Sequence, residues 1–218
     1  MPSKAKKIFS ILGILGPLAL FIASTVLSVS WSGYNFLTQY LSILGSETSP
    51  FANYVNIFGF GLFGIIMLGF AMTLGAELKN NRYADIATRL FLGGGVLIFL
   101  LGFFPTDPNF TNLTLHGRPH TLIGAIAFIM IPISMIWYGL AFKQDENWDG
   151  SWMTISFVLA MTSLAVVAIL GFFPNYIYGG TVERIGIGAN LLWIFFVSIN
   201  MLLNQQVKEV FDSGKPRL

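Results

Sequence analysis

Two histidines and an aspartate are the side chains in this sequence most suited to chemistry. His116 and His120 are the only histidines, and their i, i+4 spacing would place both imidazoles on one face of a helix. Asp107 precedes them in the same polar stretch. Two imidazoles and a carboxylate form a plausible zinc shell with one position open for water, and they can also transfer protons without a metal. We therefore expect a divalent metal such as zinc on Asp107, His116 and His120, or metal-free acid/base chemistry.

Ser42 and Glu183 are candidates for supporting that chemistry as further catalytic residues. Ser42 has no nucleophile elbow around it, since no G-x-S-x-G motif occurs in the chain. Glu183 is followed by Arg184, a pair that could bond the neighbouring loops instead of a substrate. Pro119 adds a condition, because His116 lies outside the helical face if the helix begins at that proline. A purely structural role, in solvated hydrogen bonds and ion pairs, is the alternative for the whole set.

The composition indicates a membrane protein and excludes several kinds of chemistry. The 218 residues are 55% hydrophobic and 10% charged, whereas soluble domains carry about 25% charged residues. The mean hydropathy is +0.72. Cysteine is absent, which excludes disulfides, thiolate nucleophiles and Cys-ligated metal centres. Twelve basic residues against ten acidic ones form no basic patch, so no nucleic-acid partner is expected.

The elements that must position these residues are membrane-spanning helices. A bilayer core of about 30 Å requires roughly 20 apolar residues in a helix. Six segments reach that length, and they predict an all-α polytopic bundle of three helical hairpins in one transmembrane domain, 1–218, with spans at about 8–29, 54–74, 87–104, 121–142, 152–173 and 185–203. The run from Gly59 through Gly61 to Gly64 has the letters of a dinucleotide fingerprint, but it lies inside a span, where close helix packing explains it better.

The basic residues predict the orientation of the bundle. One side collects Lys4, Lys6, Lys7, Lys79, Arg82, Arg89, Lys143, Lys208, Lys215 and Arg217, while the other has only Arg118 and Arg184. Lysine and arginine favour the cytoplasmic side, so both termini are predicted to be cytoplasmic. Two glycosylation sequons, at 109–111 and 112–114, fall in a predicted outer connection and agree with this orientation.

The first outer connection is predicted to contain a short helix lying in the membrane interface. Tyr34, Leu37, Leu41 and Leu44 recur at helical spacing, while polar residues occupy the other faces.

The order of these motifs resembles a known family. Tyr34 through Gly45, then Gly102-Phe-Phe-Pro-Thr-Asp107, then His116 and His120, then Glu183-Arg184 before the last span, are similar to the domain-of-unknown-function 998 family of prokaryotic six-helix integral membrane proteins. The resemblance implies the six-helix fold and a shared outer polar cluster, and it brings no established activity. A looser likeness exists to membrane hydrolases such as alkaline ceramidases, which combine Ser, Asp and three His around a metal, although the third histidine is missing here.

Three functional hypotheses follow for a multi-pass protein of a prokaryotic cell membrane. The first is a membrane-embedded, hydrolase-like enzyme that acts on lipid-like substrates at the outer leaflet through Ser42, Asp107, His116, His120 and Glu183. The second is a non-catalytic accessory or scaffold subunit that packs against other membrane subunits. The third is a transporter, which is less favoured because no Asp, Glu, Lys or His falls well inside a span.

Overall fold

The chain forms a bundle of long apolar helices. The computed structural model describes residues 3–108, 114–173 and 176–213, with side chains described for 4–108, 114–173 and 176–204. Both predicted sequons overlap residues 109–113 and so lie outside the described residues. The helices are α1 (Ser3–Ser30), η1 (Leu41–Gly45), α2 (Ala52–Tyr54), η2 (Val55–Leu62), α3 (Phe63–Glu77), α4 (Arg82–Leu101), α5 (Gly117–Phe142), α6 (Ser151–Phe172) and α7 (Gly179–Ser213).

Among the described residues, six helical segments are long and apolar enough to cross a membrane, as the sequence predicts. They are Lys4–Ser30, Ala52–Glu77, Arg82–Leu101, Gly117–Phe142, Ser151–Phe172 and Gly179–Asn204. The second is formed by α2, η2 and α3 without interruption, and η2 is a π-helical stretch. Within the described ranges no β-strand occurs, so the all-α prediction is confirmed.

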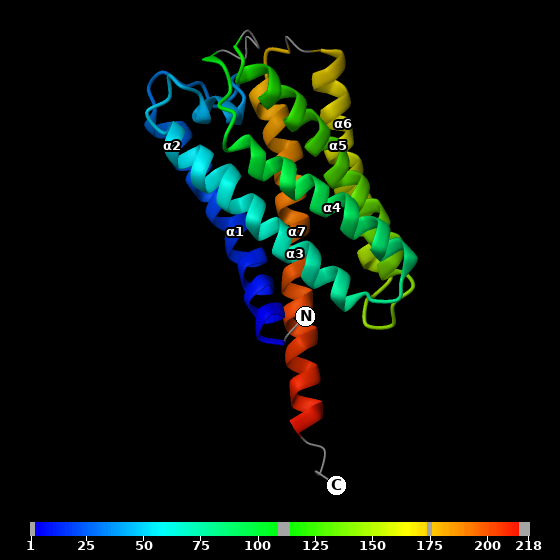
Figure 1. Ribbon diagram of the computed structural model, residues 1–218. Coiled ribbons are helices and arrows are strands. Elements are labelled where there is room, and N and C mark those ends of the chain that lie inside the picture. Colours follow the sequence, from blue (N-terminus) through cyan, green and yellow to red (C-terminus); the bar gives the residue numbers. More distant parts are fainter. Residues whose placement is uncertain (1–2, 109–113, 174–175, 214–218) are drawn as a thin grey trace.

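The helices pack largely in chain order, and the last helix, α7, packs against the first, α1. Each of α4, α5 and α6 packs against the helix before it and the helix after it, and α1 packs against both α3 and α7. Figure 1 shows the start of α1, the end of α7 and the two short connections around residues 78–81 and 143–150 toward one end. We call this the basic end. The opposite end, called the polar end below, is formed by residues 31–51, 102–108, 114–120 and 176–184.

Local side-chain bonds define the helix ends at the basic end. The Asn81 side chain accepts hydrogen bonds from the backbone N–H groups of Tyr83 (2.9 Å) and Ala84 (3.3 Å), which caps α4. Lys6 of α1 pairs with Glu77 at the end of α3, with 3.0 Å between Nζ and Oε2. The second bond joins α1 to α3 where the membrane-spanning segments end.

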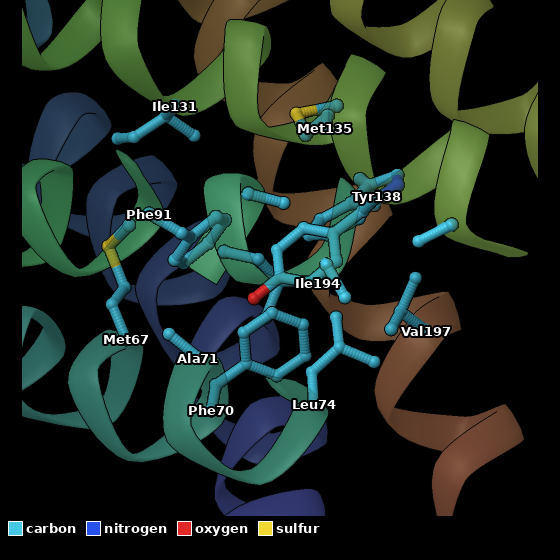
Figure 2. Close-up of a cluster of buried hydrophobic side chains, with 14 of the residues drawn as sticks. Met67, Phe70, Ala71, Leu74, Phe91, Ile131, Met135, Tyr138, Ile194 and Val197 are labelled. Atoms are coloured by element: carbon cyan, nitrogen blue, oxygen red, sulfur yellow. The ribbon is translucent and has the colours of Figure 1, made fainter. Parts of the chain in front are cut away.

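The core is a cluster of buried hydrophobic side chains, many of them aromatic (Figure 2). The Trp193 ring centroid lies 5.8 Å from that of Phe70, 5.8 Å from that of Phe91 and 5.6 Å from that of Tyr138. The polar atoms carried by these rings are also satisfied. Trp193 Nε1 donates to Ser156 Oγ (2.9 Å), and the Tyr138 hydroxyl lies 2.9 Å from Thr88 Oγ1. This part of the interior is therefore filled by aromatic rings whose polar atoms are bonded within the bundle.

In the glycine run of the second span, Gly64 serves close helix packing and Gly59 does not. A Cβ at Gly64 would lie 2.5 Å from the backbone nitrogen of Phe99, so α3 and α4 touch there as predicted. A Cβ at Gly59 would meet nothing closer than Val55 Cγ1 at 3.6 Å and Leu20 Cδ1 at 3.7 Å. The prediction of close packing is therefore wrong for Gly59, which faces an open space described below.

The predicted interfacial helix in the first connection is not formed. Only the 3₁₀ helix η1 is present between α1 and α2, and the Asn35 side chain accepts from the backbone N–H groups of Leu37 (3.0 Å) and Thr38 (3.2 Å). Such local side-chain bonds compete with helix formation. Tyr34 and Leu44 are buried, so their side chains pack into the bundle instead of lying on its surface.

Candidate functional site

The first connection is bound directly to the start of α7. Gly180 N–H donates to the carbonyl oxygen of Thr38 (3.2 Å), and the Thr181 N–H and hydroxyl both donate to that of Leu37 (3.0 Å each). A Cβ at position 180 would overlap the carbonyl of Gln39, so glycine is required for this approach. The backbone around residues 37–39 is thereby held against α7.

Arg184 is the main brace of this connection. Its Nη1 donates to the carbonyl oxygens of Gln39 (3.0 Å) and Gly180 (2.9 Å), and its Nη2 donates to the Tyr34 hydroxyl. The guanidinium carbon lies 4.2 Å from the ring centroid of Phe36. Burial raises the pKa of Tyr34 in spite of the nearby Arg184 charge, so the hydroxyl stays protonated and shares its proton between the carbonyls of Gln39 and Tyr40. Arg184 thus stabilises the contact between the first connection and α7 through hydrogen bonds to backbone carbonyls.

Glu183 positions η1, the helix that carries Ser42. Its side chain is buried, and Oε2 accepts a hydrogen bond from the backbone N–H of Leu41, the first residue of η1. Burial, and after it the negative charge of Glu183, raises the pKa of the neighbouring Tyr40 hydroxyl. Glu183 is therefore a positioning residue at the polar end.

Three buried oxygen atoms at the polar end have no hydrogen-bond partner among the described residues. They are Ser42 Oγ, Asn56 Oδ1 and Thr106 Oγ1. Asn56 belongs to η2 and also ties it to η1, because its Nδ2 donates to the carbonyl of Gly45 (3.0 Å). An unsatisfied buried polar atom costs about 1–3 kcal/mol, so such atoms call for a water molecule or a ligand. The sequence analysis missed Asn56 and Thr106; an amide inside an apolar span was the available signal for Asn56.

Asp107 covers the amino-terminal end of α5. Its carboxylate accepts from the backbone N–H of Thr114 (3.0 Å) and from the Thr114 hydroxyl. Thr114 Oγ1 in turn accepts from the N–H groups of Gly117 (3.0 Å) and His116 (3.3 Å). A Cβ at Gly117 would overlap the Asp107 carboxylate. The anion therefore lies against a helix start, where the helix dipole stabilises negative charge.

The two histidines at the start of α5 differ in burial. Because α5 begins at Gly117, His116 is the residue before the helix, and its side chain is exposed. His120 lies inside the helix with 4% of its surface exposed, and its Nδ1 lies 2.6 Å from the carbonyl oxygen of Phe104. A carbonyl accepts only, so Nδ1 carries the proton and, in the neutral ring, Nε2 is an acceptor. Pro119 is the third helical residue, so the helix does not begin at that proline. The backbone of His116 has helical angles (φ −97°, ψ −41°), and its carbonyl accepts a hydrogen bond from the N–H of His120 (3.1 Å), so the shared helical face stays a prediction.

The predicted metal shell of Asp107, His116 and His120 is not assembled. In the part of the chain with described side chains, no three His, Asp or Glu residues form a group that could hold a metal ion. The Asp107 carboxylate accepts hydrogen bonds from Thr114, and His116 is exposed whereas His120 is buried.

A large apolar cavity lies beside this polar end. It has a volume of about 810 Å³ and is bounded by α1, η1, η2, α3, α4, α5 and α7. Leu41 and Leu44 of η1 close it toward the polar end, and Phe60 lines it while its ring contacts that of His120, with 5.6 Å between centroids. Gly59 faces this space, and the π-helical turn that carries it is a feature often found at functional sites.

The cavity opens sideways between α1 and η2. Several lining side chains there are 46–64% exposed, namely Ile22 and Val26 of α1, Tyr54 at the end of α2, and Phe58 and Leu62 of η2. All five lie within segments that span the membrane, so the opening faces hydrocarbon and not water. An apolar molecule dissolved in the bilayer could enter without leaving it.

Comparison with known proteins identifies a family. A family model described as "Protein of unknown function (DUF998)" matches residues 14–200. No curated protein and no solved structure matches the chain.

Proposed function

The chain belongs to the DUF998 family of membrane proteins, and we propose that it is a lipid-binding hydrolase-like enzyme of the cell membrane. In this proposal the cavity holds the hydrocarbon part of a lipid-like substrate, and the polar end acts on its headgroup. The observation that carries the proposal is an apolar cavity that opens to the bilayer and is lined by residues of η1 and η2, the two elements that also carry the unpaired atoms Ser42 Oγ and Asn56 Oδ1.

The dimensions and lining of the cavity support a lipid. Pockets for small molecules measure about 300–1,000 Å³ and are mostly apolar with few polar groups, and this cavity falls in that range. A membrane lipid would enter through the side opening and place its headgroup near η1. Ser42 Oγ and Asn56 Oδ1 would then receive the partners they lack within the described part of the chain.

His120 is the proposed general base of a metal-free hydrolysis. Its Nε2 takes a proton from a water molecule while the water oxygen attacks the carbonyl carbon of an ester or amide in the lipid. The bond from that carbon to the leaving oxygen or nitrogen breaks, and the leaving group receives the proton. Ser42 binds the headgroup. The negative charge of Asp107 stabilises the protonated His120 ring, and Glu183 holds η1 in place through its hydrogen bond to Leu41. His116 has no part in this step.

The matched pair His116→Ala and His120→Ala tests the proposal. In vesicles of bacterial polar lipids, mass spectrometry should detect fatty acid released by the wild type and by His116→Ala. A positioned general base contributes about 10²- to 10⁴-fold, so His120→Ala should release fatty acid at least about a hundredfold more slowly. Ser42→Ala should slow release as well. Equal release by His120→Ala and the wild type would contradict the proposal.

A non-catalytic scaffold is a second candidate, and one observation favours it. The carboxylates of Asp107 and Glu183 both accept hydrogen bonds from within the chain, as expected of residues with a structural role. If the chain is a scaffold, we expect no lipid turnover by any variant. Gly64→Leu would push α3 away from α4 and should disrupt assembly with partner subunits, whereas Gly59→Leu should not.

The orientation is part of the proposal, with both termini in the cytoplasm and the polar end at the outer leaflet. The absence of cysteine makes the chain a clean background for single-cysteine labelling. With a membrane-impermeant maleimide on intact cells, Glu47→Cys and Leu115→Cys at the polar end should be labelled. Lys79→Cys and Lys143→Cys should be labelled only after the cells are permeabilised. The reverse pattern would overturn the orientation, because the basic residues would then lie outside.

A further inference from the structure

One polar side chain lies deep in the cavity, far from the polar end. Asn190 is among the lining residues, and it is 8% exposed. It lies eleven residues beyond Gly179, the first residue of α7, or about 16 Å along a helix that rises about 1.5 Å per residue. Asn190 is therefore near the middle of the roughly 30 Å hydrocarbon layer.

The Asn190 amide is only half satisfied. Its Nδ2 donates to Ser163 Oγ on α6 (3.1 Å), which fixes the side chain between the two helices. Its Oδ1 is buried and has no hydrogen-bond partner among the described residues. In hydrocarbon, a polar atom without a partner costs several kcal/mol, and such groups in membrane spans commonly belong to functional sites.

We propose that Asn190 binds a hydroxyl group carried by the apolar part of the cavity's ligand. The ligand class is then a long-chain alcohol or a lipid with a hydroxylated chain. This inference rests on the proposed function, in which the cavity holds a lipid, and it specifies the chemistry of that lipid.

A water molecule is a poorer partner than a ligand hydroxyl. A buried water needs two to four polar partners. The cavity residues on the helical turns around Asn190 are Ile187, Leu191 and Ile194, and Ile131 of α5 faces the same space. A hydroxyl on a hydrocarbon chain satisfies one amide oxygen while the rest of the molecule covers the apolar wall.

A hydroxyl also fits better than a charged group or a carbonyl. No Asp, Glu, Lys, Arg or His belongs to the described lining of the cavity, so a carboxylate or an ammonium ion would enter without a counter-charge. A carbonyl accepts only and could not satisfy Oδ1. A hydroxyl both donates and accepts, so it pairs with the amide even if the oxygen and nitrogen exchange places.

Photolabelling with two matched probes tests the inference. The full chain in phosphatidylcholine nanodiscs is labelled with a long-chain alcohol that carries a diazirine, or with its methyl ether, and labelling is counted by intact mass spectrometry. One hydrogen bond contributes about 0.5–1.5 kcal/mol, so the wild type should prefer the alcohol about two- to tenfold. Asn190→Leu should bind both probes equally. Asn200→Leu, on the same helix but outside the cavity lining, should keep the preference.

The outcomes separate this inference from the function on which it rests. Gly59→Leu places a side chain in the cavity, and Ala23→Trp narrows the side opening; both should reduce labelling by both probes. Labelling that falls in these two variants supports the cavity as a lipid site. If the wild type then shows no preference for the alcohol over the ether, or if Asn190→Leu keeps that preference, the hydroxyl site is overturned. Unchanged labelling in Gly59→Leu and Ala23→Trp would overturn the cavity as a lipid site and the inference with it.

Discussion

Trp193→Ala should destabilise the protein by about 3–5 kcal/mol, the usual loss when a large aromatic side chain is removed from a core. Trp193 has no exposed surface, and its ring contacts those of Phe70, Phe91 and Tyr138. Truncation leaves a cavity among these rings, and Ser156 Oγ loses the hydrogen bond from the indole nitrogen. Thermal unfolding in detergent micelles, followed by near-ultraviolet circular dichroism, would show a strongly lowered midpoint.

Two further variants show whether burial is the cause of that loss. Trp193→Phe keeps most of the ring contacts and loses the hydrogen bond, so its midpoint should fall between those of the wild type and Trp193→Ala. Phe172→Ala removes an aromatic side chain that is 82% exposed, at the end of α6, and should change the midpoint little. Equal losses from Phe172→Ala and Trp193→Ala would contradict the assignment of the core.

Arg184→Ala should release the first connection from α7 and cost about 2–3 kcal/mol, since hydrogen bonds to charged groups contribute about 1.5–3 kcal/mol. The variant loses the bonds to Gln39, Gly180 and Tyr34 together with the contact on Phe36. Limited proteolysis should then cut the connection between residues 31 and 49, which stays intact in the wild type. The position of η1, and with it Ser42, would be lost at the same time.

Lysine should not rescue this position. Its ammonium group lacks the planar fork with which arginine binds several acceptors at once, so Arg184→Lys should be cut nearly as fast as Arg184→Ala. Arg82→Ala is the matched control, because Arg82 is an exposed arginine at the basic end. Protection of the connection in Arg184→Ala would show that the backbone bonds from Gly180 and Thr181 hold it alone.

The six spans were predictable because each follows from the composition of one continuous segment. A helix in hydrocarbon satisfies its own backbone hydrogen bonds, so about 20 apolar residues suffice to predict it without knowledge of its neighbours. Each predicted span overlaps the corresponding observed one, from the first at Lys4–Ser30 to the last at Gly179–Asn204. The family match over residues 14–200 agrees with the resemblance seen in the order of the polar motifs.

The details of the polar end were less predictable, because small local shifts reverse where a side chain points. His116 immediately precedes α5 and is exposed, whereas His120 lies inside the helix and is buried, so the spacing alone does not predict their surroundings. In the first connection, the side-chain bonds of Asn35 prevent the helix that the spacing of Tyr34 and Leu44 suggests. Both differences arise where capping and turn bonds compete with helical periodicity.

By itself, then, the sequence determined the membrane environment, the helical class, the number of spans and the set of polar residues at one end. Only the tertiary structure decided which of those residues meet. Glu183 reaches the N–H of Leu41 across 142 positions in the chain, and Arg184 reaches Tyr34 across 150. The cavity, its side opening and the half-satisfied Asn190 also depend on how separate helices pack. The reason is that hydrophobicity and length act within a segment, whereas hydrogen bonds between side chains and the spaces between helices depend on the relative positions of several segments.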